Sequence, residues 1–195
     1  MLLAIAAVAT AWAAYQSARW HSQQAEAQSA SIAARVESTR AANVANRQAQ
    51  IDVALFTQWV DAYARDETKL AGFYRKRFRP EFQPAFAAWV ATRPRTNPDA
   101  PLSPFALPQY KLAATAQAER LEAQAAASSA SVGHYIQRAD NYSLAVVLFA
   151  ASLFFAGIST RLASTTPRAL VLGLGYTLCL GSLIWIATFP VSLSV

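Results

Sequence analysis

Two histidines, His21 and His134, are the side chains of this sequence best suited to bind a metal or to titrate near neutral pH. Both lie on segments predicted to be neighbouring antiparallel helices, roughly 5 and 12 Å beyond an apolar boundary. In contact they would form a pH-sensitive pair or a weak metal site. A metal needs further ligands, and Glu26 and Asp140 are the only carboxylates nearby. We therefore expect surface histidines, with no metal and no cofactor.

A basic and aromatic cluster, FYRKRFRPEF, spans 73–82. Basic groups interleaved with aromatic rings can bind nucleic acid, anionic glycans or acidic lipid headgroups. Alternatively, the rings pack inside the fold while the charges are solvated or pair with the acidic residues Asp61, Asp66, Glu67 and Glu81, as exposed ion pairs commonly do. Candidate contacts for a polyanion or a partner are Arg75, Lys76, Arg77 and Arg79.

The sequence lacks the motifs of common catalytic sites. It has no glycine-rich phosphate loop, no His-Glu zinc motif and no serine elbow. Its one cysteine, Cys179, can form neither an intrachain disulfide nor a cysteine metal cluster. The apolar stretches carry no ionisable side chain of the kind that couples ions in transporters. The sequence thus argues against an enzyme and against a secondary transporter.

The apolar segments that anchor the rest of the chain are predicted to be membrane helices. The chain is 54% hydrophobic and only 14% charged, whereas soluble chains carry about 25% charged residues. The stretches 144–160 and 169–195 contain no charged side chain, and a spanning helix needs about 20 residues. Residues 1–18 form a third apolar stretch, which we expect to start a few residues before Met1. Aromatic residues expected at the membrane interface are Tyr15, Trp20 and Tyr142.

The predicted fold is an all-α membrane protein in which a long antiparallel helical hairpin with a small helical cap projects from three transmembrane helices. The spans are 1–18, 142–160 and 169–189, with a short basic loop at 161–168 and a tail at 190–195. The water-exposed domain is 19–141. It comprises a long helix over 19–70, a proline-rich tip over 71–108 with a short helix near 84–92, and a return helix over 109–141.

Apolar periodicity predicts how the hairpin packs. Large apolar residues recur at helical spacing and form a stripe along the long helix, at Ile32, Val36, Val44, Ile51, Leu55, Trp59 and Ala62. Small residues predict close, coiled-coil-like packing of the two long helices, in which Ala25, Ala33 and Ala34 face Ala114, Ala118 and Ala125 of the return helix. A second stripe, formed by Val53, Phe56 and Val60, leaves little polar face on the upper part of the long helix. We expect the short helix of the tip to cover this second stripe, using Phe82, Phe86, Trp89 and Val90.

Small residues recur every four positions in the predicted spans. One row contains Ser152 and Ala156, and another contains Gly173, Thr177 and Gly181. Such rows let membrane helices approach closely. They predict tight packing within one protomer or, alternatively, an oligomer interface.

The loop 161–168 also predicts orientation, because short loops rich in arginine stay on the cytoplasmic side. Arg161 and Arg168 therefore place the helical domain outside a bacterial inner membrane, although Arg19 and Arg138 act in the opposite direction. An extracytoplasmic domain would not meet nucleic acid, so envelope polyanions remain as candidate ligands of the basic cluster.

Several segments carry a resemblance: AWAAYQSARW (11–20), IDVALFTQWVDAYARDE (51–67), FRPEFQPAFAAWVATRP (78–94) and NPDAPLSPFALPQYKL (97–112). In these the chain resembles a group of uncharacterised bacterial membrane proteins. The resemblance covers nearly the whole chain and implies a helical segment between one N-terminal and two C-terminal membrane helices. It implies no catalytic or binding residues.

Three functions are consistent with these features. The first is a non-enzymatic membrane scaffold or accessory subunit whose hairpin binds a membrane-protein partner or another copy of itself. The second is a homo-oligomeric channel or pore, which hydroxyl side chains would line: Ser152, Thr160, Thr177 and Ser182. The third is a sensor accessory subunit that passes a signal to another membrane protein.

Overall fold

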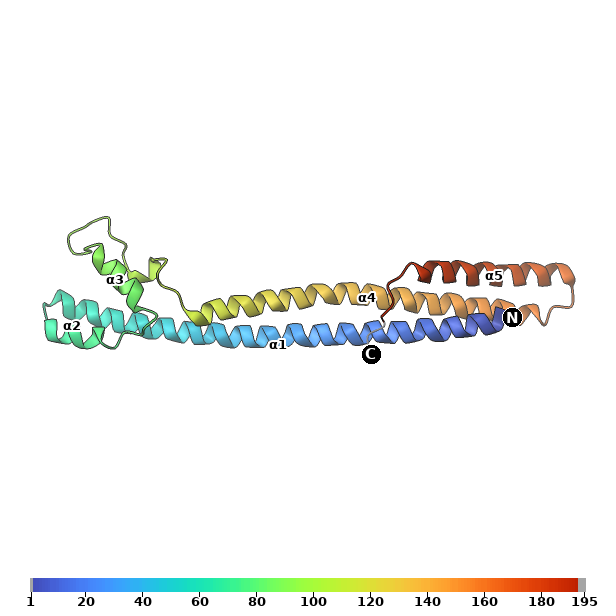
Figure 1. Ribbon diagram of the computed structural model, residues 1–195, viewed down its shortest axis with the longest axis horizontal. Helices are drawn as coiled ribbons and strands as arrows, with labels where there is room; N and C mark the ends of the chain where they lie inside the picture. Colours follow the sequence, from blue (N-terminus) through green and yellow to red (C-terminus); the bar gives the residue numbers. More distant parts are fainter. Residues whose placement is uncertain (1, 193–195) are drawn as a thin grey trace. The chain divides into compact units, whose positions relative to one another are not determined.

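The chain is helical throughout its regular structure. The computed structural model describes residues 2–192, of which the secondary structure is all helix with no strand. Figure 1 shows the helices in chain order. They are α1 (Leu2–Ala64), α2 (Thr68–Arg75), α3 (Gln83–Ala91), the 3-10 turn η1 (Pro104–Ala106), α4 (Ala113–Ser159) and α5 (Thr165–Ala187). The predicted all-α class is confirmed for this part of the chain.

Contacts divide the chain into two compact units. Unit 1 combines Met1–Ser31 with Ala126–Val195, and unit 2 is Ile32–Ala125. The helices α1 and α4 therefore each contribute to both units. The unit boundaries lie between three and four turns further along α1, and between four and five turns earlier in α4, than the expected edges of the water-exposed domain, 19 and 141.

The first long helix ends earlier than predicted, at Ala64 and not near Leu70. Asp66 adopts a left-handed conformation with φ of 58°. The Glu67 N–H donates to the Ala62 carbonyl at 2.9 Å, and the Asp66 N–H donates to the Tyr63 carbonyl at 3.2 Å. This pair of bonds is the Schellman ending of a helix, in which Asp replaces the usual glycine. Residues 68–75 then form α2, which the sequence reading missed.

Two other helix starts also differ from prediction. The return helix begins at Ala113 and not at Gln109, and it continues into the second apolar stretch as the single helix α4. Helix α5 begins at Thr165 and not at Ala169. Pro167 lies in the first turn of α5, where its missing N–H would be unbonded in any case. The basic loop is accordingly shorter than 161–168.

Within residues 2–192, α4 and α5 are long and apolar enough to cross a membrane. Only 33% and 17% of their most apolar windows are buried, so these helices are not the enclosed core of a soluble domain. Large apolar side chains point outward from both helices. They include Val147, Phe154, Leu170 and Ile184, each at least 61% exposed. Exposed apolar surface of this extent needs a non-aqueous covering.

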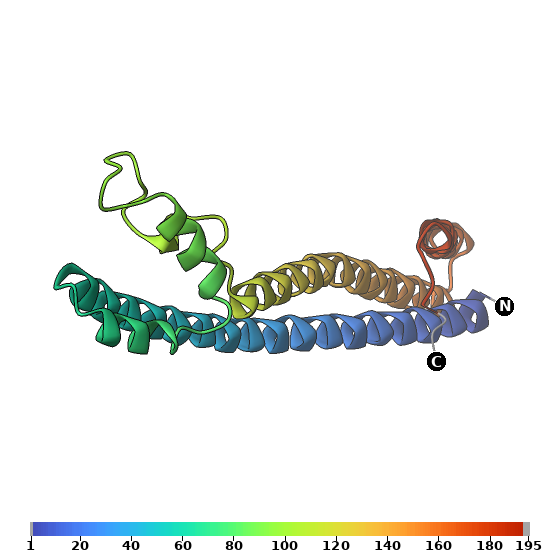
Figure 2. The same cartoon turned by 60° about the vertical axis from the view of Figure 1, so that its left-hand side comes forward.

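The core of unit 1 joins α1, α4 and α5. Small side chains of α1, Ala6, Ala9 and Ala13, are buried together with Tyr142 and Phe149 of α4. Polar contacts add to this packing. The Ser17 hydroxyl donates to the Ala139 carbonyl at 3.2 Å and lies 2.8 Å from the Ser143 hydroxyl. In Figure 1, α5 runs beside the C-terminal half of α4, and Figure 2 looks nearly along the axis of α5.

The segment that follows α5 is held against α1 in unit 1. Gln16 is fully buried. Its side-chain amide donates to the Ser192 carbonyl at 3.5 Å, and its oxygen accepts from the Ser192 N–H at 3.1 Å. The Gln23 amide donates to the Ser192 hydroxyl at 2.8 Å. These bonds satisfy a buried polar side chain that would otherwise destabilise an apolar core.

In unit 2 the buried seam of α1 is made of small residues. Of the alanines predicted to face the return helix, Ala34 is buried as expected, whereas Ala33 is exposed. The buried positions alternate by three and four residues, as in a coiled coil: Ala34, Ser38, Ala41 and Ala45. The Ser38 hydroxyl donates to the Ala118 carbonyl of α4 at 3.0 Å. The N-terminal part of the large apolar stripe is exposed, from 37% at Val44 to 56% at Ile32, whereas Trp59 and Ala62 of the same stripe are buried. Small side chains permit the closer approach, and this closer approach leaves the large residues outside.

Candidate functional site

The tip of unit 2 is built around a cluster of aromatic rings. It gathers side chains of α1, α2, α3 and the loops between them. Its buried members are Phe56, Trp59, Phe78, Phe82, Phe86 and Trp89. The predicted packing of Phe82 and Trp89 against Phe56 is confirmed, with ring centroids 6.1 and 5.2 Å apart in edge-on geometry. In contrast, Val53, Val60 and Val90 stay largely exposed.

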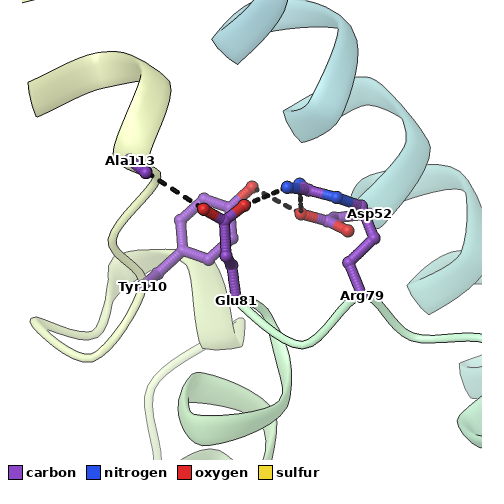
Figure 3. A network of polar contacts seen from close by, with 5 residues as sticks. All are labelled: Asp52, Arg79, Glu81, Tyr110 and Ala113. Carbon is purple, nitrogen blue, oxygen red and sulfur yellow. Dashed lines mark hydrogen bonds and ion pairs between the residues drawn. The ribbon is translucent and has the colours of Figure 1, made fainter. Parts of the chain in front are cut away.

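A polar network lies beside these rings (Figure 3). Asp52 of α1, which is fully buried, accepts from Arg79 at 3.0 Å and from the Tyr110 hydroxyl at 3.1 Å. Arg79 also pairs with Glu81, which in turn accepts from the Ala113 N–H at 3.2 Å. The network thus joins α1, the segment before α3, and the first residue of α4.

The buried position of this network changes its acid-base properties. Burial raises the pKa of the Asp52 carboxyl, and this effect outweighs the lowering by Arg79 and by the Tyr110 hydrogen bond. Burial, followed by the nearby Asp52 charge, raises the pKa of the Tyr110 phenol. Tyr110 therefore acts as a hydrogen-bond donor. The Asp52 Oδ1 atom has no hydrogen-bond partner among the described residues.

The predicted basic cluster separates into two groups. Arg79 is only 20% exposed and forms ion pairs with Asp52 and Glu81, so its charge is used inside the tip. Arg75, Lys76 and Arg77 are exposed. The Arg77 guanidinium lies over the Phe73 ring at 3.3 Å. Arg75 lies near the Phe86 ring at 5.9 Å, and no carboxylate within residues 2–192 pairs with it.

The Arg75 side chain borders three adjoining hollows in the surface of unit 2, which together we call the Arg75 groove. The largest hollow, about 550 Å³, is walled by aromatic side chains that include Trp59, Tyr63 and Trp89. Arginines also border it, namely Arg75, Arg93 and Arg95. The second, about 500 Å³, adds Lys76, and the third, about 260 Å³, adds Asp66.

Sequence reading missed two of these arginines. Arg95 lies 4.9 Å from the Tyr63 ring centroid and pairs with Asp66 at 3.3 Å. Arg93 has a φ of 55° and follows the end of α3, where the next residue is Pro94. Both residues lie outside the basic run at 75–79. The sequence does show that two arginines follow α3 closely. That these arginines lie near Arg75 depends on the tertiary fold.

The two histidines do not form a metal site with other ligands. Both are exposed, and the His21 ring lies 3.2 Å from the Gln24 side-chain oxygen. Among the described residues, no group of three histidine, cysteine or carboxylate side chains is positioned to hold a metal ion.

The expected interface aromatics differ in burial. Tyr15 is 54% exposed, whereas Trp20 is 4% and Tyr142 1% exposed, so both of the latter pack within unit 1. Trp20 stacks on Tyr135 with a centroid distance of 5.9 Å, and Arg138 lies 4.6 Å from the Trp20 ring. Arg161, in the connection after α4, and Arg168, in the first turn of α5, are both exposed.

Helices α4 and α5 approach through one of the predicted small rows and not through the other. Ser152 and Ala156 of α4 are buried, and the Ser152 hydroxyl donates to the Gly175 carbonyl of α5 at 2.7 Å. A Cβ atom at Gly175 would lie 3.3 Å from the backbone carbonyl oxygen of Ser152. The α5 row is exposed, namely Gly173, Thr177 and Gly181, so it does not carry the packing between α4 and α5. The face of α5 in contact with α4 carries Gly175, Cys179 and Ser182, and an oligomer interface through the exposed row stays a prediction.

Comparisons of this chain with protein-family models, with curated proteins and with solved structures found no match.

Proposed function

We propose that this chain is a non-enzymatic, multi-pass inner-membrane protein that binds a partner through the tip of its helical domain. The observation that carries the proposal is the Arg75 groove, an exposed aromatic and basic surface in a chain with two candidate membrane-spanning helices. The groove offers binding chemistry, namely rings and guanidinium groups. Among the side chains that line the groove, no nucleophile lies beside a base, as an enzyme active site would require.

The proposal includes a third span at the start of α1. Support comes from the two sides of this segment. One side carries Ala6, Ala9 and Ala13, which are buried in unit 1. The other carries large exposed apolar side chains, among them Val8 at 71% and Trp12 at 42%. A helix that packs on α4 and α5 on one side and is apolar on the other matches a lipid-facing helix of a small bundle.

We further propose the antiparallel hairpin arrangement and an extracytoplasmic tip. Contacts between α1 and α4 within each unit support the hairpin, namely Ser17 with Ala139 and Ser38 with Ala118. Two exposed arginines support the orientation, Arg161 in the short connection between α4 and α5 and Arg168 in the first turn of α5. In this orientation the groove faces envelope components and not nucleic acid.

The pore and sensor alternatives have less support. The Thr177 hydroxyl donates to the Gly173 carbonyl of its own helix at 2.9 Å, and the Ser182 hydroxyl donates to the Leu178 carbonyl at 2.7 Å. Hydroxyls bonded in this way need no aqueous path. A sensor accessory would use the same tip contacts as a partner-binding protein, so the partner hypothesis includes it.

Photo-crosslinking in intact cells tests the proposed function. A photoreactive residue replaces Leu102, which is 99% exposed at the tip, and in a matched variant it replaces Ile32, which is 56% exposed on α1. We expect a discrete crosslinked product that is several-fold more abundant for the Leu102 variant. Absence of any product at the tip, with normal protein levels in the membrane, would contradict the proposal.

Orientation has its own test. In a Cys179→Ser background, one new cysteine at Leu102 is exposed to a membrane-impermeant maleimide. Labelling in intact cells is expected for an extracytoplasmic tip. Labelling only after the membrane is opened would place the tip in the cytoplasm. It would contradict the orientation inferred from Arg161 and Arg168.

A further inference from the structure

The charges around the Arg75 groove are unbalanced. Among the described residues, Arg95 pairs with Asp66, whereas neither Arg75 nor Arg93 has a carboxylate partner. Lys76 adds a further positive charge beside the second hollow. Guanidinium groups bind carboxylates in two-pronged geometry, which a point charge does not provide. The groove is therefore complementary to a ligand that carries several carboxylates.

The floor of the groove is apolar and aromatic. Trp59, Phe86 and Trp89 are between 4% and 7% exposed, and Tyr63 is 40% exposed at the rim. Phe86 meets Trp59 edge-on, with a centroid distance of 4.8 Å. The largest hollow, about 550 Å³, lies within the range of ligand pockets, about 300–1,000 Å³. Such a hollow suits one inserted aromatic or large apolar side chain.

The groove is extended, because its three hollows share the Arg75 side chain. An extended site fits a short length of polypeptide better than one compact molecule. We propose that the Arg75 groove binds an acidic peptide segment of a partner protein, which inserts one aromatic or large apolar side chain between Arg75 and Arg93. This inference rests on the proposed partner-binding function and names the chemistry of the partner.

The test uses the full chain in nanodiscs of phosphatidylcholine and isothermal titration calorimetry. The probe is a capped hexapeptide with three glutamates around one tryptophan. Three matched peptides replace the glutamates by glutamine, the glutamates by lysine, or the tryptophan by alanine. We expect the acidic tryptophan peptide to bind at least about tenfold more tightly than each of the others, because each lacks one charged or apolar contact.

Substitutions in the chain locate the binding. Arg75→Ala and Arg93→Ala are each expected to weaken the acidic peptide about tenfold. The matched control is Arg65→Ala, since Arg65 is also exposed and basic but pairs with Asp61 outside the groove. Helix content by circular dichroism checks that each variant is folded. Arg75→Lys keeps the charge without the planar group, so a loss of intermediate size is expected.

Equal binding of all four peptides, no binding of any, or an equal loss with Arg65→Ala would overturn the inference. Binding of the acidic tryptophan peptide is also compared between nanodiscs of phosphatidylcholine and of phosphatidylglycerol. Loss of binding in phosphatidylglycerol would assign the groove to lipid headgroups and would overturn the inference. Crosslinking at Leu102 separates the two proposals. If crosslinks persist while the peptides fail, the partner-binding function stands and the acidic-peptide inference falls.

Discussion

Replacing Phe82 by alanine should open the tip of unit 2 and leave unit 1 intact. Phe82 is 0% exposed, and its ring meets five other rings, with centroids between 5.0 and 6.1 Å. Removing a fully buried phenylalanine side chain costs about 3–5 kcal/mol, which combines lost transfer free energy with the cavity left behind. We expect a cost near the upper end of this range, because the surrounding rings are rigid and collapse poorly into a cavity.

Hydrogen exchange followed by mass spectrometry measures this effect region by region. A decrease of about 3 kcal/mol or more in the free energy of opening raises the open population by about 100-fold or more. Amides that the folded tip protects should then exchange faster by the same factor. Peptides covering Phe56 and Trp89 report on unit 2, and a peptide covering Phe149 reports on unit 1. The last should be unchanged, because distant sites act independently.

The matched control is Leu102→Ala, since Leu102 is 99% exposed and its truncation should change stability by no more than about 0.5 kcal/mol. The reasoning would be refuted if Phe82→Ala accelerated exchange in the tip no more than Leu102→Ala does. It would also be refuted if Phe82→Ala accelerated exchange at Phe149 as strongly as at Phe56, because the aromatic cluster would then not be a local core.

Three further predictions concern the polar network and the membrane helices. Tyr110→Phe removes a hydrogen bond to a buried carboxylate and should destabilise the tip by about 1–3 kcal/mol, measured by the same exchange. Because burial raises the pKa of Asp52, the folded tip favours the protonated carboxyl. Stability from this group is present below the ordinary pKa of 3.8 and is lost as pH rises through the raised value. The stability of Asp52→Asn relative to wild type, measured by thermal unfolding across this range, should therefore increase with pH, and a decrease would contradict the assignment. In the two candidate membrane-spanning helices, Gly175→Leu should separate α4 from α5, because a Cβ at Gly175 would already lie 3.3 Å from the backbone carbonyl oxygen of Ser152. Gly173→Leu meets nothing within 4 Å and should leave the melting temperature in detergent nearly unchanged.

The helices themselves could be predicted because their signals are local. Alanine-rich segments without proline form α1 and the first part of α4, and the charge-free stretches cover the C-terminal part of α4 and most of α5. Proline-rich composition correctly located the irregular tip, and Phe82, Phe86 and Trp89 were correctly expected to pack on α1. The end of α1 could not be predicted in the same way, because Asp66 adopts a conformation that glycine usually supplies.

The sequence by itself determined the helical period, the apolar lengths and the aromatic content of the tip. Only the tertiary structure decided which face of each helix is buried. The sequence offered both a large apolar stripe with Ile32 and a row of small residues with Ala34. The structure buries Ala34 and leaves Ile32 exposed, since two helices with small contact residues approach more closely. The same reason separates Gly175 from Gly173 in α5.

Tertiary structure also decided which charged side chains form ion pairs and which stay exposed. Arg75 and Arg79 are equivalent in the sequence, four residues apart in one basic run. Arg79 reaches the buried Asp52 and is neutralised there, whereas Arg75 stays exposed and joins Arg93 at the groove. Local sequence fixes which side chains are charged. The pairing of those charges depends on long-range packing, which brings residues far apart in the chain within the few ångströms over which an ion pair forms.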